Sequence, residues 1–127
     1  FDTKLVSQKL IDFAKEEGFK IDRLEYNFVD SEKMYSLNKD FLNHDTDTDI
    51  ITFDYSKSKM IIAEVFISRE MLIKNASENM QSIENESFRL LSHGLLHCMG
   101  FKDNTVEEKA IMRKKEEEFI FAVSRET

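Results

Sequence analysis

Hydrophobic residues recur at helical spacing in residues 3–17, 30–43 and 85–99. The predicted helices cover residues 3–17, 30–43, 69–78, 85–99 and 105–123. Boundary signals accompany the first and last of these helices. Gly18 follows the first helix as a stop, and "TVEE" from Thr105 matches a capping box at the start of the last. The pattern therefore predicts a chain built mainly from amphipathic helices.

Three shorter segments are typical of strands. "LEYNFV" (24–29) alternates between apolar and polar residues, while "DIITFDY" (49–55) and "MIIAEVFIS" (60–68) are rich in branched and aromatic residues. The polar "SKSK" between the last two is short enough for a hairpin-like connection. Strands mixed with helices favour an α+β fold, with a small mixed central sheet packed by four to five helices.

Composition narrows the class of protein. A length of 127 residues fits one domain, residues 1–127, and 41% hydrophobic with 34% charged residues is typical of a soluble globular protein. The chain shows no apolar run of about 20 residues and no secretory leader, and its one cysteine suits a reducing compartment. We therefore expect a cytoplasmic protein with no membrane partner. The net charge of -7 argues against indiscriminate nucleic-acid binding but not against a local basic groove.

The stretch "SHGLLHCMGFKDN" (92–104) carries the candidate chemistry, with two of the three histidines and two of the three glycines. On a helix, His93 and His97 lie at i and i+4 on one face, where two imidazoles can reach one ion. Gly100 ends this helix, and the chain reversal there can return Asp103 as a third, oxygen ligand. Three protein ligands leave a position for water, which is typical of a catalytic metal site.

Gly94 bears on the same site, because glycine inside a helix costs about 1 kcal/mol relative to alanine. Close approach of a strand or substrate to that helix face would compensate. In the alternative interpretation, both histidines are ordinary surface or core residues and Gly94 has no special role. Gly94 also stands where HExxH metallopeptidases carry their glutamate base, which disfavours peptidase chemistry unless another carboxylate such as Glu64 enters the site.

Three other features have both a functional and a structural interpretation. Asp49 is a candidate partner for a ligand imidazole, but we favour a role with Thr48 in starting a strand. Cys98 adjoins His97, yet neighbouring helical positions point about 100° apart, so buried packing is favoured over a Cys–His nucleophile. The run "RKKEEE" (113–118) is interpreted as a solvated helix face.

Three motifs together resemble one protein family. "HGLLHCMGFKD" resembles the signature H-G-x-L-H-x-x-G-aromatic-D-H of the YbeY family, bacterial rRNA maturation factors described as metal-dependent endoribonucleases. "LNKDFLNHDTDTDIITF" (37–53) is similar to that family's L-N-x-x-[YF]-R-x-x-D-x-P-T-D-V-L-S-F, and "AEVFIS" (63–68) to its G-D-I-x-I-S strand. The motifs occur in the family's order and spacing from about Leu24 to the end of the chain.

This resemblance implies a function and a set of partners. It implies an α+β fold with one divalent metal, usually described as zinc, on a zincin-like histidine helix. It also implies a hydrolase that cleaves single-stranded RNA in 16S rRNA 3′-end maturation and ribosome quality control, with rRNA and the small ribosomal subunit as partners. The first alternative is a ribosome assembly or interaction factor whose metal is mainly structural, and the second is a zinc metallopeptidase.

The third metal ligand departs from the family pattern. Asp103 stands where the family has its third histidine, and Lys102 stands where the family has aspartate. A carboxylate is a competent zinc ligand, so we predict His93, His97 and Asp103 as the metal ligands. An ion held by them would lower the pKa of its water and polarise a phosphoryl oxygen.

A second departure concerns the catalytic cation. Leu42 stands where the family has an arginine after the aromatic residue. Lys39, one turn earlier, and His44 are the candidate replacements for this cation. Glu64, which stands with Ala63 in place of the family's Gly-Asp, is the third catalytic candidate.

Overall fold

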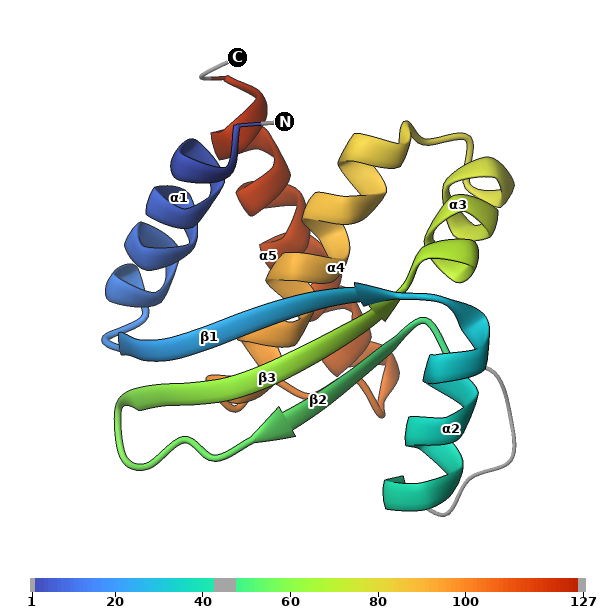
Figure 1. The fold of residues 1–127 in the computed structure, drawn as a ribbon. Helices are drawn as coiled ribbons and strands as arrows, with labels where there is room; N and C mark the ends of the chain where they lie inside the picture. Colours follow the sequence, from blue (N-terminus) through green and yellow to red (C-terminus); the bar gives the residue numbers. More distant parts are fainter. Residues whose placement is uncertain (1, 43–47, 126–127) are drawn as a thin grey trace.

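All the strands that the structure describes lie in the first part of the chain, among the first two helices, and helices alone make up the end (Figure 1). The computed structural model describes residues 2–42 and 48–125. Its elements are α1 (Thr3–Glu16), β1 (Lys20–Val29), α2 (Ser31–Leu42), β2 (Ile50–Asp54), β3 (Met60–Ser68), α3 (Arg69–Glu78), α4 (Ile83–Cys98) and α5 (Val106–Ser124). The predicted α+β class is confirmed. Within the described residues, no helix is both long and apolar enough to cross a membrane.

The sheet is mixed, with strand order β1-β3-β2. β1 pairs in parallel with the central strand β3, from Lys20 opposite Met60 to Val29 opposite Ser68. β2 pairs with β3 in the antiparallel direction, as the short polar connection predicted. The central strand is thus paired along both sides, and the predicted small mixed sheet is confirmed.

Two elements begin earlier than the sequence pattern predicts. β1 starts at Lys20 instead of Leu24, because its first residues pair with β3 across an irregularity between Ile21 and Arg23. These residues do not alternate in polarity, so only the pairing partner makes them a strand. α4 starts at Ile83, because the Ser82 side chain accepts a hydrogen bond from the backbone N–H of Asn85 and caps the helix.

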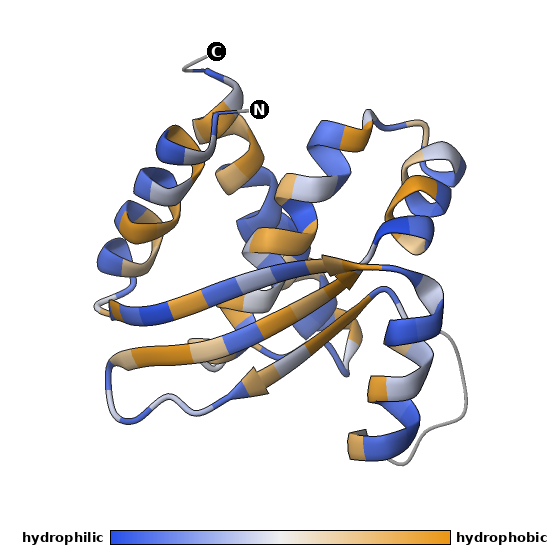
Figure 2. Cartoon of the chain, viewed as in Figure 1, coloured by the Kyte–Doolittle hydropathy of each residue, from blue (hydrophilic) through white to orange (hydrophobic). Residues whose placement is uncertain are grey.

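The two faces of the sheet pack against different helices. Side chains alternate along β3, so Ala63, Val65 and Ile67 face a core built with α1, α4 and α5, while Phe66 points the other way. On that second face, α2 contributes Met34 and other buried apolar residues. Figure 2 shows β3 and β2 mostly in hydrophobic colours and β1 with hydrophilic segments between the hydrophobic ones, as expected for a central strand with packing on both faces. The histidine helix α4 therefore lies against one defined face of the sheet.

Candidate metal centre

Local sequence fixes the end of α4 and the chain reversal that follows it. Gly100 has φ of +96°, in the left-handed region that glycine adopts readily. Its N–H donates to the carbonyl of His97 and the Phe101 N–H donates to the carbonyl of Leu96, both at 3.0 Å, which is the Schellman pattern. The predicted stop at Gly100 is confirmed. The reversal brings the next residues, including Asp103, back beside the last turns of the helix.

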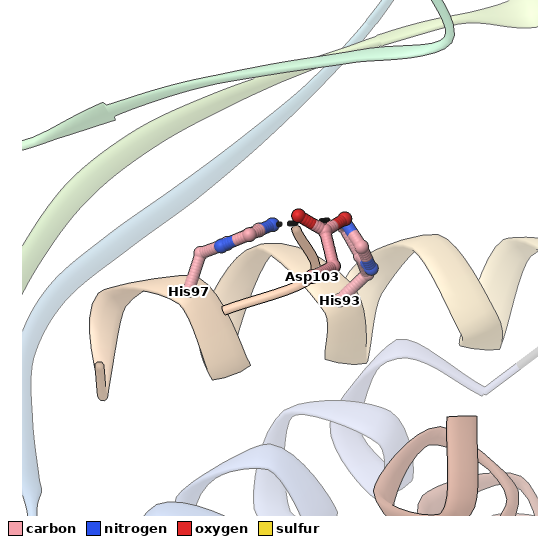
Figure 3. A group of neighbouring side chains, drawn as sticks. All are labelled: His93, His97 and Asp103. Carbon is pink, nitrogen blue, oxygen red and sulfur yellow. Dashed lines mark hydrogen bonds and ion pairs between the residues drawn. The ribbon is translucent and has the colours of Figure 1, made fainter. Parts of the chain in front are cut away.

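The structure brings the three predicted ligands together. Nε2 of His93 lies 3.0 Å from Nε2 of His97, and Oδ2 of Asp103 lies 3.5 Å and 3.7 Å from these two nitrogens. Figure 3 shows both imidazoles on the same side of α4, with the Asp103 carboxylate between their tips. Metal bonds of about 2.0–2.1 Å in tetrahedral geometry separate donor atoms by roughly 3.3–3.4 Å. The observed spacings lie around that value, so the trio could hold one ion.

A buried carboxylate orients the first imidazole. Oε2 of Glu116, a residue only 4% exposed, lies 2.7 Å from Nδ1 of His93. Because a carboxylate accepts hydrogen bonds, this contact places the ring hydrogen on Nδ1 and leaves the Nε2 lone pair facing the other two ligands. Glu116 thus selects the tautomer of His93 that can bind a metal.

Glu116 is the functional residue that sequence reasoning missed. The interpretation of 113–118 as a solvated helix face is wrong at this position, because Glu116 is buried between α5 and α4. A signal was present in the sequence. Met112, Phe119 and Val123 are the buried apolar residues of α5, and Glu116 falls on their stripe at i+4 from Met112 and i-3 from Phe119.

An arginine lies behind this carboxylate in a network of acidic groups. Arg89 donates from Nε to Glu86 at 2.9 Å and from Nη2 to the same carboxylate at 2.5 Å, and this hydrogen-bonded pair is the main cause of its raised pKa. Arg89 also lies 3.8 Å from Glu116 and 3.7 Å from Asp49. Asp49 accepts a further hydrogen bond from Asn75 at 2.9 Å. The Asp49 side chain therefore belongs to this network, and its contacts within the described residues do not include an imidazole. Asp49 also directly precedes β2, which begins at Ile50.

Gly94 allows the helix to lie close to the sheet. A Cβ placed on Gly94 would lie 3.3 Å and 3.4 Å from the two Cγ atoms of Val65 and 3.5 Å from Cδ1 of Ile50. The expected close approach of a strand is confirmed, and the interpretation in which Gly94 has no special role is wrong. The Cβ of a glutamate at this position, as in HExxH peptidases, would already be in tight contact with the Val65 side chain.

Cys98 belongs to the core. The thiol is buried, and burial followed by the charge of Asp54 raises its pKa to about 12. A thiol with that pKa is protonated at neutral pH and is a poor nucleophile. The prediction of buried packing for Cys98 is confirmed.

Two of the remaining catalytic candidates, Lys39 and Glu64, do not join the trio. Lys39 is exposed on α2, whose buried residues pack on the sheet face opposite α4. Glu64 lies between Ala63 and Val65 on β3 and therefore projects from that same opposite face, so it does not enter the metal site from this strand. His44 lies outside the described residues. Of the predicted site residues, the structure gathers only His93, His97 and Asp103 among those it describes.

Sequence comparison finds one family over nearly the whole chain. The family model described as "Endoribonuclease YbeY" matches residues 2–124. The Endoribonuclease YbeY of Cytophaga hutchinsonii is 45% identical over 105 residues, which cover 82% of this chain and 73% of the relative. The Endoribonuclease YbeY of Flavobacterium johnsoniae is 39% identical over 118 residues, covering 93% of this chain and 82% of the relative.

Structure comparison supports the fold. The solution structure of TM1509 from Thermotoga maritima matches with a TM-score of 0.71 and 23% sequence identity. The match covers 98% of this chain and 84% of that protein. The arrangement of helices and mixed sheet is therefore one that an independently determined protein also adopts.

Proposed function

This chain belongs to the YbeY family, and we propose that it is a metal-dependent endoribonuclease that hydrolyses single-stranded RNA. The observation that carries the proposal is the convergence of His93, His97 and Asp103 on one point. Their side chains are 14%, 35% and 39% exposed, so the site is partly open to solvent. A structural zinc site is normally closed by four protein ligands, whereas a three-ligand, accessible site suits catalysis.

The biological role follows from the family to which the relatives belong. We propose that the protein acts in 16S rRNA 3′-end maturation and ribosome quality control, with rRNA and the small ribosomal subunit as partners in the cytoplasm. The relatives are named as endoribonucleases, which supports RNA cleavage. The family match over residues 2–124 supports treating residues 1–127 as one domain.

Zinc is the metal that we propose. Two imidazole nitrogens and one carboxylate oxygen form a donor set that catalytic zinc sites use. Asp103 in place of a third imidazole adds negative charge and a harder ligand, which increases the relative affinity for metals such as manganese. The donor set therefore suits zinc while leaving room for exchange with other divalent ions.

The chemistry requires a nucleophile and stabilisation of charge at phosphorus. A divalent ion bound at the trio would supply both an activated water and a Lewis acid for a phosphoryl oxygen. The chain itself supplies orientation: Glu116 fixes the His93 ring, and Gly100 fixes the return of Asp103. The partly exposed side of the trio leaves access for a phosphodiester.

An RNA cleavage assay tests this proposal. Protein loaded with zinc is compared with chelator-treated protein and with His97→Ala, Asp103→Ala and Asp22→Ala, each purified in the same way. Asp22 is an exposed carboxylate on β1 and serves as the matched control for Asp103. We expect cleavage only by the loaded wild-type protein and Asp22→Ala, with Asp103→Ala strongly reduced. Equal cleavage by all samples would show a contaminating nuclease and refute the proposal.

Metal analysis of the same samples separates the ligand assignment from the activity. Asp103→Ala with unchanged zinc stoichiometry and affinity would remove Asp103 from the ligand set. Full zinc occupancy of the wild-type protein without cleavage, together with co-sedimentation with small ribosomal subunits, would favour an assembly factor with a structural metal. Cleavage of a peptide panel in place of RNA would favour the peptidase alternative.

A further inference from the structure

A small pocket opens beside the trio on the side of α5. Its volume is about 190 Å³. The lining residues are Arg89, His93, Asp103, Lys109, Met112, Arg113 and Glu116. Two of the three candidate metal ligands, His93 and Asp103, line it, so the pocket adjoins the candidate metal site.

Three cations line this pocket, but they differ in how far their charge is already neutralised. Arg89 is held by both oxygens of Glu86 and faces Glu116 and Asp49, so carboxylates surround it. Its side chain is only 27% exposed. Arg89 therefore acts as a structural cation whose charge is largely balanced within the protein.

Lys109 and Arg113 have a different setting. Both are exposed, and they lie one helical turn apart on the α5 face that also presents Met112 and Glu116 toward α4. The ion pairs found in residues 2–42 and 48–125 include neither of them. Two exposed positive charges that take part in no ion pair among the described residues therefore stand next to the proposed reaction site.

We infer that Lys109 and Arg113 form a phosphate-binding subsite for the RNA backbone next to the phosphodiester held at the trio. This inference rests on the proposed function and names the positioning residues for its substrate. An ammonium and a guanidinium one turn apart suit the oxygens of a phosphate group. The subsite also explains how a chain with a net charge of -7 can hold RNA, because the positive charge is local to the cleft.

Salt-dependent binding of a labelled single-stranded RNA oligonucleotide tests the inference. The double variant Lys109→Gln/Arg113→Gln is compared with wild type and with Lys114→Gln/Arg125→Gln. The control also removes one lysine and one arginine from the same end of the chain, at exposed positions that line a different surface depression. Thermal unfolding of all three proteins checks that the substitutions leave the fold intact.

The expected effect follows from counterion release. Each neutralised phosphate of single-stranded RNA contributes about 0.7 to the slope of log affinity against log salt, so the double variant, which loses one phosphate subsite, should lose about 0.7. At about 0.15 M salt this corresponds to roughly fourfold weaker binding, while the control keeps the wild-type slope. An unchanged slope in the double variant, an equal loss in the control, or no RNA binding by wild type would overturn the inference.

The same proteins distinguish this inference from the proposed function. RNA binding that depends on Lys109 and Arg113, in a protein that does not cleave, would support the subsite and refute the nuclease. Cleavage with wild-type KM by the double variant would support the nuclease and overturn the subsite. Binding of inorganic phosphate that the double substitution abolishes, with RNA binding unaffected, would also overturn the RNA assignment.

Discussion

The contact between Glu116 and His93 makes a sharp prediction about metal affinity. In Glu116→Gln, the amide oxygen can still accept a hydrogen bond from Nδ1–H of His93, so the shape of the contact survives and its charge is lost. A hydrogen bond to an ionised acceptor is roughly twice as strong as a neutral one. The substitution therefore isolates how far the buried charge makes the imidazole a better ligand.

The structure sets the expected size of the effect. The Nδ1 to Oε2 distance is 2.7 Å and Glu116 is 4% exposed, so water does not replace the lost charge. Removing such a partner behind a metal-bound histidine typically lowers metal affinity 10–100-fold, or about 1.4–2.7 kcal/mol. We expect about tenfold for Glu116→Gln, and a value nearer 100-fold for Glu116→Ala, which also removes the hydrogen bond.

Competition between the protein and a chromophoric chelator for zinc measures this affinity. Glu117→Gln is the matched control, because Glu117 is the next residue on α5 and is exposed. Thermal unfolding of the metal-free proteins separates ligand orientation from a general loss of stability. Wild-type affinity in Glu116→Gln, or an equal loss in Glu117→Gln, would refute the proposed role of Glu116.

Three further predictions concern stability. Gly94→Ala should leave the free energy of unfolding, measured by urea titration, unchanged or lower it by up to about 2 kcal/mol. Overpacking against both Cγ atoms of Val65 costs about 1–3 kcal/mol, while the higher helix propensity of alanine contributes only about 1 kcal/mol. An increase in the free energy of unfolding by about 1 kcal/mol would contradict this prediction. The Cys98 thiol has a pKa of about 12 in the fold, compared with about 8.5 in the unfolded chain. The folded thiol therefore keeps its proton to higher pH, and the free energy of unfolding should fall as the pH rises above about 8.5, by up to about 1.4 kcal/mol per pH unit. This fall with pH should be shallower in Cys98→Ala, and an identical fall in both proteins would refute the assignment. Thr105→Ala removes the hydroxyl that accepts a hydrogen bond from the N–H of Glu108 at 3.1 Å. This substitution should lower the free energy of unfolding by about 1 kcal/mol in the same titration. Thr105→Ser keeps a hydroxyl at this position and should retain the wild-type stability.

Helices and the ligand trio were predictable because their signals are local. The i, i+4 spacing of His93 and His97 places both on one helix face whatever the rest of the fold does. Gly100 specifies the reversal within four residues, and the capping box at Thr105 specifies the start of α5 in the same way. The resemblance to the family motifs then suggested metal binding for the residues that this spacing brings together.

The residues that the sequence interpretation misplaced depend on packing between distant segments. Glu116 lies 23 positions from His93, and only the docking of α5 on α4 turns a charged helix position into a buried partner of the imidazole. Glu64 was a catalytic candidate by its position in a motif, but pairing of β3 with both neighbours decides which face its side chain takes.

The sequence alone determined that two imidazoles and a carboxylate would meet at the end of one helix, because every contact needed lies within eleven residues. Tertiary structure decided what surrounds them: the buried Glu116, the strand against Gly94, and the exposed Lys109 and Arg113 of the adjoining pocket. The reason is physical. A helix fixes the relative positions of its own side chains, but which of its faces meets a neighbouring element depends on how the whole core packs.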